Sequence, residues 1–468
     1  MAWQYIIDPA ISGHLYVGTE GIEQQVYIGR IDESGGPRKI FFGGSGEFVS
    51  LIIGKRGSGK SHTLGNIVEG LATKDNNTSI SNHLKRRGVL LLDPMGNFWT
   101  TAHKVSSGGT SKVQTQYALF EGWDCSPEDI NVEVFLPAGF INENDPPFIK
   151  DFHISVSELD DTDLADLIEV NLVKDPQGAA LSEAFVAVTI DGWKDGDILH
   201  PAIRHYSISN LISYLEWQKG RVGDGDHSPS TLRALIRSLR VLGRLPVFSG
   251  KGTPLTKLLS PGKLSVLMLP HKVGHDLRLV ITRLLIRRIL REREEAAQIQ
   301  QRLDIEKMDE RETERLTEEL ALRVPRSVLA IDEAQDLLGD EGGGARRALD
   351  DFCLLGRNFG LSLLLATQRP SSSAISAKVR SQVDFTMIHR LVSQSDIANC
   401  YDNLLSEYPT EVRVGERVLK FSQLVRQLDR GQAIISASYA VTEHSETVNR
   451  IVVAQIRPRV TVHGGEVS

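Results

Sequence analysis

A glycine-rich segment near the start of the chain, residues 54–61, constrains the fold more than any other stretch. It reads GKRGSGKS and carries the complete spacing G-x-x-x-x-G-K-[ST]. An apolar, β-branched run precedes it, and apolar residues at helical spacing resume at Leu64 and Ile67. The sequence therefore predicts a strand, a tight loop and a helix, in that order.

This order of elements is suited to hold phosphate. Glycines let the loop adopt positive φ and bring backbone N–H groups close to phosphate oxygens, and the new helix adds its positive dipole end. We expect Lys60 to reach the β- and γ-phosphates and the Ser61 hydroxyl to take a place on Mg²⁺. Glycine-rich turns before helices also occur by chance, but here every fixed position is present. The sequence predicts that ATP binds through Gly54, Lys55, Arg56, Gly57, Ser58, Gly59, Lys60, Ser61 and His62.

Composition bounds the remaining possibilities. The 468 residues predict two to four structural units, and no apolar run has the length of a membrane helix. The isolated cysteines Cys125, Cys353 and Cys400 show neither metal-binding nor disulfide spacing, which favours a cytoplasmic location. The absence of a membrane-length apolar run favours no membrane partner. The net charge of −7 gives no global basic field, so a nucleic acid would need a local patch or a ring formed by assembly.

The first 47 residues alternate in the manner of β-strands. Apolar positions occur at Ile6–Ile7, around Tyr16, around Tyr27 and at residues 39–42, with glycine- and serine-rich turns between them. We expect a small β-unit of three to five short strands in residues 1–47. Such a unit is too small to bury much core, so it should lean on a neighbour.

Two later regions are expected to be irregular or helical. Residues 95–131 have few apolar anchors and predict a long loop. Residues 140–260 carry apolar residues at helical spacing and predict an insertion of about four helices. Its last helix aligns Arg233, Arg237, Arg240 and Arg244, which is either a nucleic-acid stripe or, as we favour, a solvated face paired with the acidic residues 158–163. Residues 276–322 predict a long, charged helix whose second half meets solvent or a neighbouring subunit.

An acid pair follows a second buried strand. Residues 328–331 are apolar and lead directly into Asp332 and Glu333. The first acid is suited to hold Mg²⁺ and the second to orient and deprotonate the attacking water. Asp-Glu pairs are common, but coupled to the phosphate loop this pair predicts a hydrolytic site.

The next buried strand, residues 361–367, ends at Gln368, which we expect to contact the γ-phosphate or the lytic water. An ordinary polar strand end is the alternative. Arg357 lies just before this strand and is suited to neutralise the transferred phosphoryl group from across a subunit boundary. Arg369, Lys378 and Arg380 are rivals for that role, and each alone could be a surface cation.

Taken together, these motifs resemble the HerA branch of the HerA/FtsK ATPases. The resemblance rests on GKRGSGKS, LLLDPMG, VLAIDEAQDLL, GRNFGLSLLLATQRPS and the closing IRPRVTVHGG, and it runs over most of the chain. It implies a hexameric ring of RecA-like subunits that threads double-stranded DNA and acts with a nuclease or another effector. It also implies that Lys60, Ser61, Asp332, Glu333 and Gln368 form the site, that Arg357 acts in trans, and that the tail braces the adjacent subunit.

Three features depart from the family pattern. The N-terminal β-unit is shorter than the usual barrel. The strand-end motif has Met95 and Asn97 where the family has His and Glu, and Glu47 and Phe48 stand where a basic residue is common.

The sequence as a whole predicts an α/β fold, a RecA-like P-loop core with a helical insertion and a small N-terminal β-unit. The expected segments are residues 1–47, a core at 48–139 and 261–449, the insertion at 140–260, and a C-terminal brace at 450–468. The predicted function is an ATP-driven translocase of double-stranded DNA in DNA-end processing or anti-phage defence. A scaffold ATPase that assembles and activates a partner enzyme is the alternative, and a conjugation-type or packaging motor is a weaker third.

Overall fold

The computed structural model describes residues 3–4, 13–18, 25–32, 38–43, 46–83, 86–221, 227–338, 343–371, 375–402, 404–405, 412–414, 417–442 and 451–465. The chain divides into two compact units. One, here called the sheet unit, comprises Met1–Val134, Leu255–Pro270 and Ile286–Ser468. The other, the helical unit, comprises Phe135–Pro254 and His271–Leu285. The division predicted from the sequence, with its boundaries at residues 47, 139, 260 and 449, stays a prediction.

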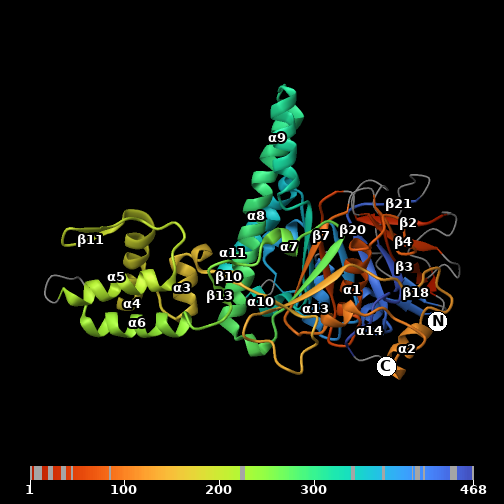
Figure 1. Cartoon of the computed structure of the whole chain (residues 1–468). Coiled ribbons are helices and arrows are strands. Elements are labelled where there is room, and N and C mark those ends of the chain that lie inside the picture. Colours follow the sequence, from red (N-terminus) through yellow and green to blue (C-terminus); the bar gives the residue numbers. More distant parts are fainter. Residues whose placement is uncertain are drawn as a thin grey trace. The chain divides into compact units, whose positions relative to one another are not determined.

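Parallel, fully buried strands form the centre of the sheet unit (Figure 1). Their order is β17, β5, β16, β15, β7 and β14. Strands buried on both faces appear in the sequence as continuous apolar runs, which is why the strands before the glycine-rich loop, before the acid pair and before Gln368 were predicted, whereas β17 was not. Their bounds are Phe385–Ile388, Val49–Ile53, Leu361–Thr367, Ser327–Ile331, Gly88–Asp93 and Lys263–Met268.

The strand order fixes where the motifs meet. β16 lies between β5, which leads into the glycine-rich loop, and β15, which leads into the acid pair. Parallel strands align their carboxyl ends at one edge, so the loop, the acid pair and Gln368 all lie at the same edge of the sheet. This arrangement confirms the predicted α/β, RecA-like fold.

The predicted N-terminal strands extend the same sheet. Next to β17 come β20 (Gln432–Ala437), β22 (Ile451–Ile456) and β3 (Gln25–Ile31), each antiparallel to the one before. β4 (Lys39–Gly43) and β2 (Leu15–Gly18) follow, and β21 (Ala440–Thr442) pairs with β2. The N-terminal strands therefore lean on the C-terminal segment through β3 and β22. The prediction at Ile6–Ile7 lies outside the described residues.

The helical unit contains α3 (Asp161–Leu167), α4 (Pro176–Val186), α5 (Ile208–Gly220) and α6 (Pro229–Leu242), which confirms about four helices in this stretch. A short hairpin, β11 (Trp193–Asp195) and β12 (Ile198–His200), joins α4 to α5. The arginine stripe of α6 is exposed, and Arg240 pairs with Glu216 of α5 at 2.9 Å. Asp163, one of the acidic residues expected to pair with this stripe, pairs with Arg283 instead.

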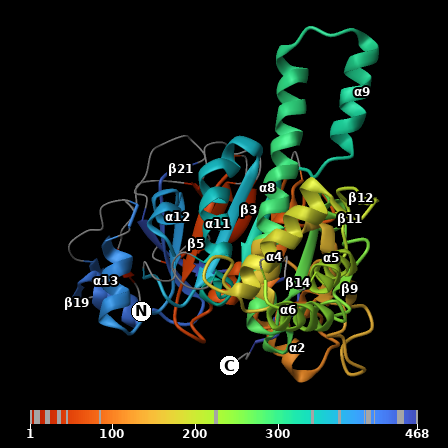
Figure 2. The ribbon, with the colours of Figure 1, turned by 90° about the vertical axis from the view of Figure 1, so that its left-hand side faces the viewer.

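Two predicted elements differ in the structure. The charged stretch 276–322 is two helices, α8 (His275–Ile305) and α9 (Glu310–Ala321), and the second half of α8 runs antiparallel to α9 (Figure 2). Asp309 caps the start of α9 by accepting a hydrogen bond from the Glu312 backbone N–H at 2.8 Å. The turn between the two helices contains no glycine or proline, so nothing in the sequence signals it.

The expected loop at 95–131 contains a 3₁₀ turn, η2 (Phe98–Ala102), and a helix, α2 (Ser111–Ala118), so the prediction of a structureless segment is wrong there. Only Gln116 of α2 is buried, and a helix without an apolar stripe leaves no periodic signal. Within the described parts of the chain, no helix combines the length and apolar character needed to cross a membrane.

Candidate functional site

The glycine-rich loop connects β5 to α1 (Lys60–Leu71) as predicted. Gly57 and Gly59 have φ values of 76° and 110°, which L side chains rarely adopt. Ser58 donates from its hydroxyl and its backbone N–H to the Lys55 carbonyl, at 2.8 and 3.2 Å. The N-cap residue of α1 is Gly59, which has no side chain to cap the helix, so the N–H groups of the first turn can face phosphate oxygens.

Lys60 and the acid pair meet at the edge of the sheet. Lys60 is 4% exposed, and its Nζ lies 2.7 Å from Glu333 Oε1 and 3.5 Å from Asp332 Oδ1. Glu333 adopts a φ of 44°, an unusual conformation for a residue other than glycine. The loop and the second acid are therefore joined by an ion pair at the position expected for the γ-phosphate.

The environment separates the two acids chemically. Burial raises the pKa of Asp332 above its ordinary value, and the charge of Lys60 only partly offsets this. Burial also acts to raise the pKa of Glu333, but Lys60 and the side-chain amides of Gln335 and Gln368 outweigh it and hold the pKa below its ordinary value. Glu333 is thus kept as a carboxylate, the form that can accept a proton from water.

Gln368 lies where the sequence predicted it. Its Nε2 donates to Glu333 Oε1 at 2.7 Å. Gln335, which the sequence analysis did not single out, donates to Glu333 Oε2 at 2.7 Å and accepts from the Thr367 hydroxyl at 2.8 Å. The only sequence signal for Gln335 was its place two residues after the acid pair.

The residues predicted to hold Mg²⁺ fit that ion. Ser61 Oγ lies 3.2 and 3.0 Å from the two carboxylate oxygens of Asp332. A hydroxyl and a carboxylate are oxygen ligands of the kind that Mg²⁺ takes. Asp332 is 1% exposed, so a bound cation would also offset the cost of its buried charge.

Asp93, at the end of β7, is a third buried acid at this edge. It is fully buried and accepts from the backbone N–H groups of Met95, Gly96 and Phe98, at 3.2, 2.9 and 2.7 Å. Burial raises its pKa to about 7. These bonds shape the turn after β7, and the sequence analysis predicted the strand end without a role for its acid.

The candidate arginines lie at different edges of the sheet. Arg357 is in η6 (Gly356–Phe359), before β16, where it pairs with Asp384 and donates to the Gln382 carbonyl at 3.2 Å. That is the amino edge of the parallel strands, a strand length from the loop, so Arg357 cannot reach the phosphates bound by its own chain. Lys378 and Arg380, in α12 (Ala377–Ser381), precede β17, and the Arg380 Nε is buried without a hydrogen-bond partner among the described residues. Arg369 is exposed and follows Gln368 at the loop's own edge.

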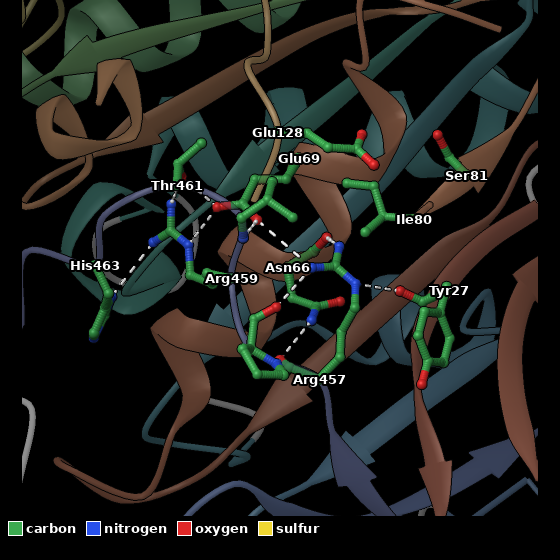
Figure 3. Close-up of polar contacts among 12 residues, drawn as sticks. Tyr27, Asn66, Glu69, Ile80, Ser81, Glu128, Arg457, Arg459, Thr461 and His463 are labelled. Carbon is green, nitrogen blue, oxygen red and sulfur yellow. Dashed lines mark hydrogen bonds and ion pairs between the residues drawn. The ribbon is translucent and has the colours of Figure 1, made fainter. Parts of the chain in front are cut away.

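The C-terminal tail contacts α1 of its own chain (Figure 3). Glu69, fully buried on α1, accepts from Arg459 Nε at 2.6 Å, from the Val460 N–H at 3.0 Å and from the Thr461 hydroxyl. Arg457 donates to the Asn66 carbonyl at 2.8 Å and to the Tyr27 carbonyl at 2.6 Å. The predicted contact of the tail with an adjacent subunit stays a prediction.

The tail also touches the segment after β7. Arg459 lies over the Phe98 ring, and Thr100 donates to the Val462 carbonyl at 2.8 Å. In α2, Gln116 Nε2 and Lys112 Nζ donate to the carbonyls of His463 and Gly464, at 3.1 and 2.9 Å. Residues 457–464 therefore connect the phosphate-loop helix to α2, and we call them the strap.

Comparisons with known proteins bear on this geometry. Residues 50–289, just over half of the chain, match the model of the family described as "Helicase HerA, central domain". No match was found among curated proteins.

Several solved structures are similar. VirB4 of Thermoanaerobacter pseudethanolicus is 12% identical with a TM-score of 0.49, over 95% of this chain and 98% of that one. The bacterial conjugative coupling protein TrwBdeltaN70 is 14% identical with a TM-score of 0.43, over 89% and 88%. The genome packaging NTPase B204 of Sulfolobus turreted icosahedral virus 2 is 9% identical with a TM-score of 0.29, over 87% and 97%.

The family match covers the phosphate loop and extends to β14 and the first half of α8, and the site assembled here has the parts that ATP hydrolysis needs. The chain belongs to the HerA family and is a P-loop ATPase.

Proposed function

We propose that this chain is the subunit of a ring-shaped, ATP-driven motor that moves double-stranded DNA. The observation that carries the proposal is the joining of Lys60, Glu333 and Gln368 at one edge of the sheet, while Arg357 lies at the other. A chain with a complete water-activating site and a distant arginine needs a neighbour to supply that arginine. A hexamer of the kind the sequence resembles would provide one.

Each residue then has a part in hydrolysis. The loop amides and Lys60 bind the phosphates, and Lys60 exchanges Glu333 for the γ-phosphate as its partner. Glu333, released from Lys60 but still bonded to Gln335, orients the attacking water and accepts its proton. Ser61 and Asp332 would hold Mg²⁺, which would supply neutralisation of the phosphate charge. The neighbour's Arg357 completes the site.

The surface of the segment 95–131 is the proposed DNA contact. Lys104 and Lys112 are exposed there, although Lys112 also donates to the strap. Lysines close to DNA release bound counterions from the phosphate backbone, so the contact should weaken as salt rises. A nuclease or other effector partner and a cytoplasmic location complete the proposal.

Displacement of a third strand from linear duplex DNA tests this function. A motor that moves along the duplex strips off a triplex-forming oligonucleotide in the presence of ATP. We expect displacement by the unmodified protein and none by Glu333→Gln, which keeps the fold. A protein that hydrolyses ATP on duplex DNA yet leaves the third strand in place would contradict translocation.

One observation favours a second candidate, the scaffold ATPase. Near the β11–β12 hairpin of the helical unit, Ile190, Ile198 and Leu199 are 65%, 63% and 62% exposed. These three exposed apolar side chains fall within ten residues of the chain, and exposed apolar surface is typical of sites that bind protein partners. ATP hydrolysis at the same rate with and without DNA, together with a partner protein whose binding depends on these residues, would favour the scaffold.

A further inference from the structure

A buried histidine lies beneath the phosphate loop. His389 follows β17 directly and is fully buried. Its backbone N–H donates to the Ile53 carbonyl at 2.8 Å, which places its ring under the residues that follow β5. A Cβ added at Gly54 would lie 2.8 Å from the His389 Cβ, and one added at Gly59 would lie 3.5 Å from the ring. The imidazole thus supports both ends of the loop.

The two ring nitrogens have partners that define the protonation state. Nδ1 lies 2.8 Å from the Gln432 carbonyl, which can only accept, so Nδ1 carries the proton. Nε2 lies 2.9 Å from Thr63 Oγ1 and, in the neutral ring, accepts from that hydroxyl. Burial, with the charge of Lys60, lowers the pKa of His389 to about 4, which agrees with a neutral ring at pH 7.

These partners connect the loop to a rigid part of the sheet. Thr63 lies in the first turn of α1, and its backbone N–H donates to the Gly59 carbonyl at 2.9 Å. Gln432 begins β20, and its side chain donates to Asp32 at 2.8 Å. The hydrogen bonds therefore run from the start of α1 through His389 to β20.

We propose that His389 is a positioning residue of the nucleotide site, which sets the shape of the phosphate loop before nucleotide binds by holding the Thr63 hydroxyl. It touches neither the phosphates nor the attacking water. The role concerns the ATPase site and is independent of the proposed action on DNA. A loop that is held in shape loses less conformational freedom on binding, so the effect should appear in nucleotide affinity rather than in the chemical step.

Three substitutions separate this role from ordinary packing. Thr63→Val removes the hydroxyl at nearly constant shape, while Thr63→Ser keeps it. His389→Asn keeps a donor for the Gln432 carbonyl but has no atom that can reach Thr63. His83→Gln is the matched control, because His83 is also buried and bonds to the other end of α1, at the Gly70 carbonyl 2.6 Å away.

Two measurements need no catalysis. Hydrogen exchange of residues 54–66 in the nucleotide-free protein reports the loop, and calorimetry with ADP reports affinity. We expect faster exchange and about three- to tenfold weaker ADP binding for Thr63→Val and His389→Asn, the size of one lost buried hydrogen bond. The double variant should be no worse than either single one, because both remove the same bond. Thr63→Ser should match the unmodified protein.

Kinetics and the control decide the outcome. The KM for ATP should rise, while kcat should stay within about twofold of that of the unmodified protein. This is expected when binding of the ground state and of the transition state weakens equally. His83→Gln should lower the thermal midpoint without changing loop exchange or ADP affinity. The proposal is overturned if Thr63→Val and His389→Asn behave like His83→Gln.

Discussion

Lys60 has two carboxylate partners in its own chain, Asp332 and Glu333. Its contact with Glu333 at 2.7 Å and the buried surroundings mean that the lysine charge is already compensated. In the proposed mechanism, the γ-phosphate displaces a carboxylate from Lys60, and this displacement frees Glu333 to act on water. The contact that compensates the charge of Lys60 would also hold the base until a phosphate competes for the lysine.

Glu333→Gln should separate binding from hydrolysis. The amide is neutral and competes poorly for Lys60, so ATP should bind more tightly than to the unmodified protein. Hydrolysis should fall by about 10²–10⁴, the typical contribution of a general base. Equilibrium binding of ATP and single-turnover hydrolysis measure the two effects. Weaker ATP binding in this variant would show that Glu333 does not compete with phosphate for Lys60.

Buried histidines make stability depend on pH. Burial lowers the pKa of His389 to about 4 and that of His463 to about 3, from an ordinary value of 6.5. Below pH 6.5 these histidines bind protons in the unfolded chain but not in the folded chain. Their contribution to the free energy of unfolding is therefore complete above that pH and is lost as pH drops toward 4. Urea midpoints at about pH 7.5 and pH 5 should differ less in His389→Gln. If the two urea midpoints differ as much in His389→Gln as in the unmodified protein, His389 does not contribute to the pH dependence of stability.

Among the elements, β5, β15 and β16 were predictable, whereas β17, β22 and the contacts between distant segments were not. Strands such as β7 and β15 appear in the sequence as continuous apolar runs because both of their faces are buried. The carboxyl ends of β5, β15 and β16 bring Lys60, Glu333 and Gln368 together, as expected from parallel strands. Glu69 is a polar residue in a helix, and nothing in its local sequence distinguishes a fully buried carboxylate from a solvated one. Its partners lie near the other end of the chain.

The strap should matter more for stability than surface ion pairs do. Glu69→Gln leaves Arg459 buried beside a neutral group, and breaking one side of a buried pair costs about 3–5 kcal/mol. We expect the thermal midpoint to fall by several degrees. Glu312→Gln is the control, because Glu312 pairs with Arg302 at 3.3 Å on the exposed α8–α9 hairpin and should leave the midpoint unchanged. Equal midpoints for both variants would contradict a structural role of the strap.

At the scale of the whole molecule, the proposal is that one chain is an incomplete enzyme. Arg357 is held at the amino edge of the sheet by Asp384, which also accepts from the Val49 N–H at 2.9 Å. The sequence alone favoured a trans role for Arg357 over three rival cations but could not show its distance from the loop. That distance depends on strand direction and order, which are properties of the fold.

Mixed assemblies test the shared site. Arg357→Ala and Glu333→Gln should each abolish hydrolysis when assembled alone. Mixed in one ring, a Glu333→Gln subunit can offer its intact Arg357 to the intact acid pair of an Arg357→Ala neighbour. Partial activity should therefore return on mixing. If mixing restores nothing although mixed rings form, Arg357 does not act across a boundary.

The central claim is that hydrolysis is coupled to DNA, and steady-state ATPase with and without linear duplex DNA tests it most directly. Glu333→Gln, measured in parallel, shows how much activity belongs to this site. We predict stimulation of several-fold, lost in Glu333→Gln and reduced as salt rises. Hydrolysis that depends on Glu333 but is the same with and without DNA would contradict the motor and favour the scaffold.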